Sequence, residues 1–230
     1  MQTHNLDEFL DRYVDSYLLG DLLTIKEKVP ADAQPGNAAY LMTAAICSGI
    51  EFLGTLTTSQ ETLPACDACG KPEQFRNKFP FEHYCKHYLA KVDKRYSEFG
   101  PIVRELIRNG IAHSFATKGK IGITRVGDKS DHLVRMSDEG FLVINTDVFY
   151  EDFKKSYLDY ARTDIKKGGK HHSLALENYE RMRLVKEGEI ERIMTQVESK
   201  LDWPWVNKSV SYYPELVDQF EETGEVQFVS

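Results

Sequence analysis

Three residues near the middle of the chain carry groups that suit phosphodiester cleavage: Arg108, Asn109 and His113. An imidazole titrates near neutral pH and moves protons, and a guanidinium holds phosphate oxygens through a fixed fork of donors. An amide orients either of these partners. We therefore predict that His113 transfers the proton, that Arg108 stabilises the charge growing on phosphorus and that Asn109 orients its neighbours.

A helix that begins near Pro101 must position these groups, because proline suits a first helical turn. At about 100° per residue, one side of this helix carries the residues expected to pack on the core: Val103, Leu106, Ile107, Gly110, Ile111 and Ser114. The opposite side carries Glu105, Arg108, Asn109, Ala112 and His113. Because Asn109 and His113 form an i,i+4 pair, the polar groups are expected to converge away from the core.

The run Arg108-Asn109-Gly110-Ile111-Ala112-His113 resembles the signature of the HEPN superfamily. That signature is an Arg, a polar residue, three more residues and a His, on a helix near the end of a bundle. The resemblance covers roughly residues 40 to 115 and includes the earlier run Glu51-Phe52-Leu53-Gly54. It implies a metal-independent endoribonuclease that acts as a homodimer, with the signature residues of both protomers lining a shared cleft.

The same resemblance implies roles and partners. Arg108, Asn109 and His113 would form the catalytic set, and Glu51 would support it by pairing with Arg108. The alternative for Glu51 is a buried structural carboxylate paired with another side chain. RNA would be the substrate, in a toxin-antitoxin or antiviral defence setting, with an antitoxin or regulatory protein as a further partner. Because some HEPN proteins have lost catalysis, a non-catalytic module that binds RNA, a nucleotide or a protein is the alternative function.

A second pattern is typical of zinc ligands: Cys66-x-x-Cys69 is followed by His83-x-x-x-His87. A Cys-x-x-Cys-Gly turn and an i,i+4 histidine pair on a helix both suit tetrahedral zinc. The alternatives are a reduced loop and two polar positions on a helix. If zinc is present we expect a structural site, and a zinc-stabilised interaction protein is then a third function. Catalysis itself is expected to need no cofactor, because the motif contains no carboxylate cage for Mg²⁺.

Composition favours one intracellular domain with appendages. The chain has 230 residues, a net charge of -7 and four cysteines, which are too few and too unevenly spaced for a disulfide framework. The first residues lack a basic segment followed by an apolar one, and no stretch was expected to approach the roughly 18 apolar residues of a membrane span. We therefore expect a cytoplasmic protein without a membrane partner.

Basic residues occur in three groups despite the negative net charge: Lys86, Lys91, Lys94 and Arg95; Lys118, Lys120, Arg125, Lys129 and Arg135; and a linker from residue 166 to 172 that is expected to be flexible. Such groups steer RNA toward a site in some proteins. In most proteins a single group of this kind is solvated surface.

The pattern along the chain predicts a mainly α fold, an HEPN-like helical bundle with a small antiparallel β-meander inserted after the motif helix. Residues 1–172 would form this domain, with the meander at about 120–146, and residues 173–230 would add a helix and tail packed on it. A capping box is predicted at Asn5 and Glu8. The apolar run from Ala38 to Leu56 is expected to form the central buried helix.

Overall fold

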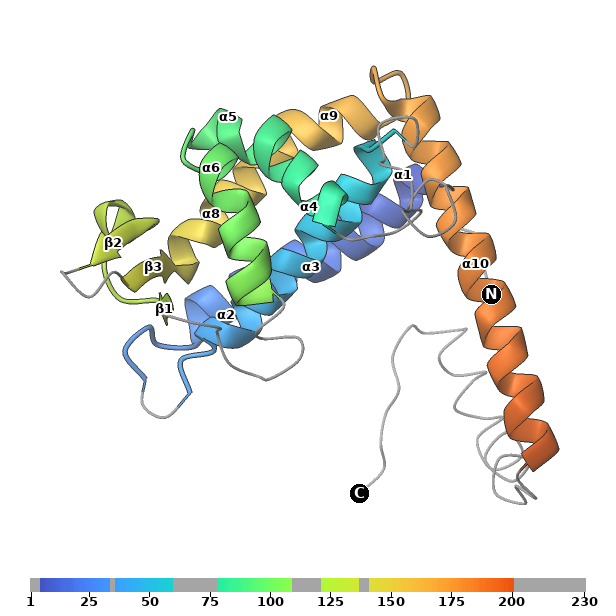
Figure 1. Ribbon diagram of the computed structural model, residues 1–230, viewed down its shortest axis with the longest axis horizontal. Helices are drawn as coiled ribbons and strands as arrows, with labels where there is room; N and C mark the ends of the chain where they lie inside the picture. The colour runs from blue at the N-terminus through green and yellow to red at the C-terminus, as the bar shows by residue number, and fades with distance from the viewer. Residues whose placement is uncertain (1–4, 34–35, 60–77, 109–120, 137–140, 201–230) are drawn as a thin grey trace, which may run out of the picture. The chain divides into compact units, whose positions relative to one another are not determined.

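The computed structural model describes residues 5–33, 36–59, 78–108, 121–136 and 141–200 (Figure 1). The chain divides into two compact units, Met1–Glu180 and Arg181–Ser230, and the division falls inside the last helix. The predicted packing of the C-terminal tail falls on residues 201–230, outside the described residues, so it stays a prediction.

The described chain is mainly helical, as predicted. Apart from the short 3-10 helix η5 (Lys129–Asp131), its helical elements join into six continuous helical rods. Several α-helices continue directly into π-helical turns, which are labelled η1, η3, η4 and η6. In chain order the rods are α1 (Leu6–Phe9), η1 (Leu10–Leu18) and α2 (Leu19–Lys28); α3 (Ala39–Thr57); α4 (Lys78–Tyr84), η3 (Cys85–Leu89) and α5 (Ala90–Val92); α6 (Tyr96–Ile102) and η4 (Val103–Arg108); α8 (Thr146–Ser156), η6 (Tyr157–Ala161) and α9 (Arg162–Ile165); and α10 (His172–Lys200).

The first rod begins at the predicted capping box. The Asn5 side chain accepts a hydrogen bond from the Glu8 amide at 2.9 Å, and the Glu8 carboxylate accepts one from the Asn5 amide at 3.2 Å. These two bonds satisfy backbone donors that a helix start leaves without partners. The prediction of a capped helix start is therefore confirmed.

Helix α3 is the central helix of the first unit, as predicted, and it packs against α2, α4, α8 and η4 (Figure 1). Small residues permit these contacts: a Cβ on Gly54 would lie 2.0 Å from the backbone oxygen of Pro80 in α4. At its C-terminal end the buried Asn178 side chain donates to the carbonyls of Thr55, Leu56 and Thr58. This amide satisfies the carbonyls that the helix end leaves without intrahelical partners.

The same helix is long and apolar enough to pass a length-and-composition test for a membrane span, so the expectation that no stretch approaches that length was wrong. Its mean hydropathy over the best window is 1.4, and 56% of that window is buried inside the protein. A core helix of a folded domain gives the same signal, because a helix surrounded by other elements is apolar nearly all round. Within the described residues it is the only such helix.

The predicted start of the motif helix at Pro101 was also wrong. Helix α6 begins at Tyr96 and runs through Pro101, and the rod changes from α to π geometry at Val103. Proline has no amide hydrogen and crowds the preceding turn, which disfavours continued α-helical bonding. A wider π turn directly after the proline accommodates the missing bond.

The sheet has three strands, but it is mixed instead of an antiparallel meander. Strands β1 (Ile121–Thr124), β2 (Val134–Met136) and β3 (Phe141–Asn145) lie in the order β1-β3-β2. Strand β3 pairs antiparallel with β2 and parallel with β1. The central position of β3 matches its burial, since Leu142, Val143 and Ile144 are all buried and a central strand is covered on both faces.

Candidate functional site

The last described part of the helix that leads into the motif is η4. Its apolar side packs on the rest of the first unit, as predicted. Val103 and Ile107 are 1% and 0% exposed, and η4 contacts α3, α4 and α6. The opposite side carries Glu105, which is exposed. The side chain of Leu106 lies outside the described residues. The prediction of one core-facing and one outward-facing side is therefore confirmed for the described part of η4.

The catalytic set itself lies mostly beyond the described residues. Arg108 is the last residue of η4, and its side chain is not described. Asn109 and His113 fall in residues 109–120, outside the description. Their convergence with the Arg108 guanidinium stays a prediction from the sequence.

Glu51, the predicted supporting residue, lies on α3, the helix that contacts η4. Its side chain is half-buried, and the hydroxyl of Thr55, one turn later, donates to the Glu51 backbone carbonyl at 2.8 Å. The helix contact places Glu51 and the motif helix in the same part of the first unit. The pairing of Glu51 with Arg108 stays a prediction, because the Arg108 side chain is not described.

Sequence reasoning missed Arg104, which lies four residues before Arg108 on η4. Its side chain is 16% exposed and its Nη1 lies 3.6 Å from Oε2 of Glu105. Its Nε atom is buried without a hydrogen-bond acceptor in the described part of the chain. Arg104 is thus a second guanidinium on the helix that leads into the motif. The signal in the sequence was the spacing of four between two arginines.

The π geometry of η4 does not by itself mark a site. Isolated π turns inside helices occur frequently at functional sites. In the described residues, however, η1, η3 and η6 have the same geometry and lie in three other rods. The wide turn therefore adds no specific support for η4.

Only two of the four predicted zinc ligands lie within the described residues. His83 and His87 lie on α4 and η3 with ring centroids 4.4 Å apart. Cys66 and Cys69 fall in residues 60–77, outside the described residues. Among the described side chains, no group of three or more His, Cys, Asp and Glu residues is arranged to hold a metal ion. The four-ligand site therefore stays a prediction.

The histidine pair lies beside cations. Burial is the main cause that lowers the pKa of His83 to about 4, with added repulsion from His87, His171 and Lys86. Burial also lowers the pKa of His87, and the nearby charges of Lys86, Lys91, His171 and Lys170 add to the effect. Residues 170 and 171 are thus close to a helix that is about 80 positions earlier in the chain.

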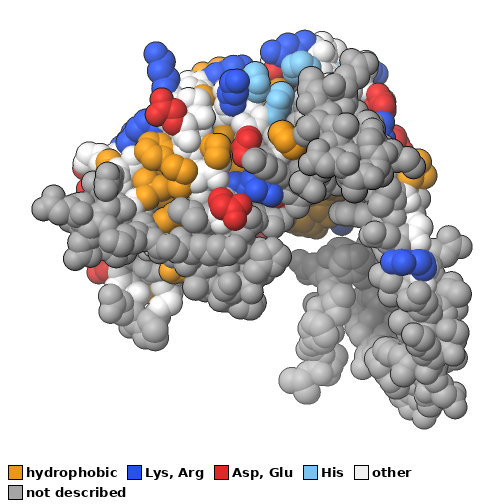
Figure 2. Space-filling model, viewed as in Figure 1, with side chains coloured by type: hydrophobic (Ala, Val, Ile, Leu, Met, Phe, Trp, Pro, Cys, Tyr) orange, Lys and Arg blue, Asp and Glu red, His pale blue; other side chains and the backbone are white. Residues whose placement is uncertain are grey.

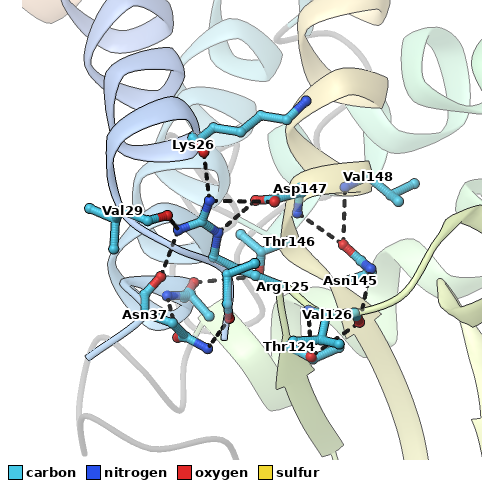
Figure 3. Close-up of polar contacts among 12 residues, drawn as sticks. Lys26, Val29, Asn37, Thr124, Arg125, Val126, Asn145, Thr146, Asp147 and Val148 are labelled. Carbon is cyan, nitrogen blue, oxygen red and sulfur yellow. Dashed lines mark hydrogen bonds and ion pairs between the residues drawn. The ribbon is translucent and has the colours of Figure 1, made fainter. Parts of the chain in front are cut away.

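Two arginines from the basic groups, which were expected to be solvated surface or to steer RNA, have structural roles instead. Figure 3 shows the Arg125 guanidinium between three elements: its Nε lies 2.8 Å from Oδ1 of Asp147, and its Nη1 and Nη2 donate to the carbonyls of Val29, Asn37 and Lys26. Its side chain is 1% exposed. Arg95 pairs with Asp93 and donates to the carbonyl of residue 132. The Arg125 guanidinium is therefore buried, whereas the Arg95 side chain is 35% exposed.

A buried polar chain of Tyr96, His132 and Asp152 was not predicted either. The backbone amide of Asn145 donates to Nδ1 of His132 at 3.2 Å. Nδ1 is therefore the acceptor, so Nε2 carries the ring proton and donates to the Tyr96 hydroxyl at 2.8 Å. That hydroxyl donates to Asp152 at 3.2 Å. All three residues are less than 5% exposed. Because they are buried and bonded to one another, we interpret the chain as structural.

Comparison with known proteins gave no match: no family model, no curated protein and no solved structure matched this chain. The likeness to the HEPN signature thus rests on the motif residues and their order alone.

Proposed function

We propose that this protein is a metal-independent endoribonuclease of the HEPN type, with Arg108, Asn109 and His113 as its catalytic residues. The observation that supports this proposal best is the packing of η4. Val103 and Ile107 bury one side of the motif helix and Glu105 on the other side is exposed, so the helix carries a polar side away from the core just before the motif.

The proposed reaction is attack by the RNA's own 2′-hydroxyl. An imidazole removes the proton from the 2′-oxygen, which bonds to phosphorus, and the bond from phosphorus to the 5′-oxygen breaks. A second acid returns a proton to the leaving 5′-oxygen, and the product ends in a 2′,3′-cyclic phosphate. Arg108 stabilises the additional negative charge on the phosphate oxygens, and Asn109 orients its neighbours.

A homodimer supplies the second acid. One chain has a single His113, whereas this reaction benefits from a separate base and acid, so we propose that two motif helices face each other across a two-fold axis. Ile102, the last residue of α6 before the motif helix turns into η4, is 39% exposed and offers apolar surface for such a contact. An antitoxin or regulatory protein would bind over the same cleft, and the proposed setting is cytoplasmic.

The decisive experiment is RNA cleavage in EDTA by wild type and single variants. His113→Ala should lose about 10²- to 10⁴-fold in rate, the usual contribution of a proton-transfer group. Arg108→Lys should also fail, because a point charge does not reproduce the guanidinium fork. Asn109→Ala should be milder. DNA of the same sequence should survive, since it lacks the 2′-hydroxyl.

The matched control is Arg12→Ala, which removes one exposed guanidinium on η1 that contacts the rings of Tyr13 and Tyr17. Its cleavage rate should equal that of wild type. Cleavage that persists in His113→Ala, or that requires a divalent metal, would refute the proposal. RNA binding without any cleavage by wild type would favour the non-catalytic module.

A further inference from the structure

One surface of the first unit gathers histidine and lysine side chains from two distant stretches of the chain. Figure 2 shows histidines beside basic side chains at the upper edge of this face. We name this surface the histidine-lysine patch and define it by six residues: His83, Lys86, His87, Lys91, Lys170 and His171. The first four lie on α4, η3 and α5, and the last two precede α10.

A tight turn brings the second stretch to the first. The segment from residue 166 to 171 was predicted to be a flexible linker, but in the structure it folds back on the end of α9. The amide of His171 donates to the Asp164 carbonyl at 2.9 Å, and that of Gly169 donates to the Lys166 carbonyl at 2.8 Å. A Cβ on Gly169 would lie 2.4 Å from the carbonyl oxygens of residues 163 and 164, so only glycine fits this close approach.

Among the described residues, only one ammonium group of the patch forms an ion pair with a carboxylate. Lys91 lies over the rings of Tyr160 and Tyr88, with Nζ 4.8 Å and 5.3 Å from the ring centroids. Lys86 is exposed. Lys170 pairs with Asp164 at 3.0 Å. Glu82, on the same helix as His83, is the other nearby carboxylate and is half-buried.

We propose that the histidine-lysine patch binds the phosphate backbone of an RNA strand. The lysines supply the charge that phosphate contacts need, and imidazole N–H groups between them supply directed donors. The choice of RNA as the ligand rests on the proposed function. The patch would hold the substrate strand by its backbone and would contribute binding without sequence preference.

The arrangement of the lysines favours an extended phosphate chain over a single anion. The charges come from two segments: Lys86 and Lys91 follow one another along η3 and α5, and the turn at residues 166–171 adds Lys170. A row of separated ammonium groups matches phosphates that repeat along a strand. Electrostatic binding of this kind is sequence-independent and depends strongly on salt.

The test is binding of a fluorescent 2′-O-methyl RNA oligonucleotide in EDTA, followed by anisotropy over a range of salt concentrations. This ligand has no free 2′-hydroxyl, so it is not cleaved. Lys86→Ala and Lys91→Ala should each reduce the magnitude of the slope of log K against log salt by about 0.7, and the double variant by about 1.4. Lys170→Ala should act in the same direction.

Two controls make the result specific. Lys28→Ala removes an exposed lysine at the end of α2, outside the patch, and should bind like wild type. The double variant Lys86→Arg and Lys91→Arg should have the salt slope of wild type, because it keeps both positive charges. Thermal unfolding of every variant should match wild type, which would show that the fold is intact.

The outcomes separate this inference from the proposed function. Equal binding and salt slope in wild type and in the double alanine variant would overturn the patch, and so would a wild-type protein that does not bind the oligonucleotide. Failure of wild type to cleave unmodified RNA would overturn the nuclease alone. A patch-dependent salt slope in a protein that does not cleave RNA would leave the patch as the binding surface of a non-catalytic module.

Discussion

Two histidines in this protein have pKa values lowered to about 4, yet their surroundings differ in every other respect. His132 is 0% exposed, and both of its ring nitrogens make hydrogen bonds within the chain. His83 is half-buried, beside a second imidazole and several lysines. A lowered pKa therefore does not by itself mark a functional group, because burial alone produces it. What separates the two is whether the polar atoms already have partners.

The cationic side chains of the two regions differ in the same way. Arg125 has its donors directed at one carboxylate and three backbone carbonyls, and its side chain is 1% exposed. Lys86 and Lys91 are exposed. In the region around Arg125 and His132, charge and hydrogen bonding are satisfied inside the protein. In the histidine-lysine patch, Lys86, His87 and Lys91 are exposed, and only Lys170 has a carboxylate partner among the described residues.

The largest expected effect is on Arg125. Arg125→Ala should lower the free energy of unfolding by about 3 to 5 kcal/mol, because it leaves the Asp147 carboxylate and three part-buried carbonyls without their donor. Urea unfolding measures the loss. Arg125→Lys should also destabilise, since one ammonium cannot reach all four acceptors. A loss below about 1 kcal/mol in Arg125→Ala would show that this region does not depend on its buried cation.

A smaller effect is expected from the titration of His132. Its pKa in the folded protein is about 4, below the value of about 6.5 in an unfolded chain. Its contribution to stability is therefore complete above about pH 6.5 and is lost as the pH falls toward 4, by at most about 3 kcal/mol. Asp152 opposes this trend, because burial raises the pKa of its carboxyl and the protonated form favours the folded state at low pH.

Urea unfolding at pH 7, 6 and 5 tests the titration. Wild type should lose stability across this range, and His132→Gln, which cannot take up the proton, should lose less. His132→Gln should also be less stable than wild type at pH 7, because its buried hydrogen bonds are disturbed. His83→Gln should flatten the pH dependence without that cost at pH 7. Parallel curves for wild type and His132→Gln would contradict the assignment.

The smallest expected effect is on Lys86. Lys86→Ala should leave the midpoint of thermal unfolding unchanged within about 2 °C, because an exposed side chain outside any network contributes little to stability. Calorimetry measures the midpoint. A large loss of stability in Lys86→Ala would remove the contrast between the two regions and would make the patch a structural feature.

Periodicity in the sequence predicted most of the helices, although not the start of α6 at Tyr96. The apolar run of α3, the capping box at Asn5 and the core side of η4 were all predicted, because each depends on residues within a few turns of one another. The three strands were also predicted as segments. The candidate catalytic residues came from spacing alone, and the part of their positioning that the structure describes is the packing of Val103 and Ile107.

Only the tertiary structure decided how the strands pair, and the ion pair between Arg125 and Asp147 fits the parallel pairing. Arg125 directly follows β1, and Asp147 lies two residues after the end of β3. For the two side chains to meet, both strands must end at the same edge of the sheet, which parallel pairing provides and antiparallel pairing of neighbours does not. Local sequence specifies neither the partner nor the edge.

The same limit applies to the histidine-lysine patch. The sequence contains its residues in two groups separated by about 80 positions, and each group alone is typical of solvated surface. The turn at residues 166–171 joins them, and it depends on how closely Gly169 approaches the carbonyls at the end of α9. Charge and residue type were determined by the sequence, whereas their convergence required a folded chain, because contacts between distant segments depend on packing that no local pattern encodes.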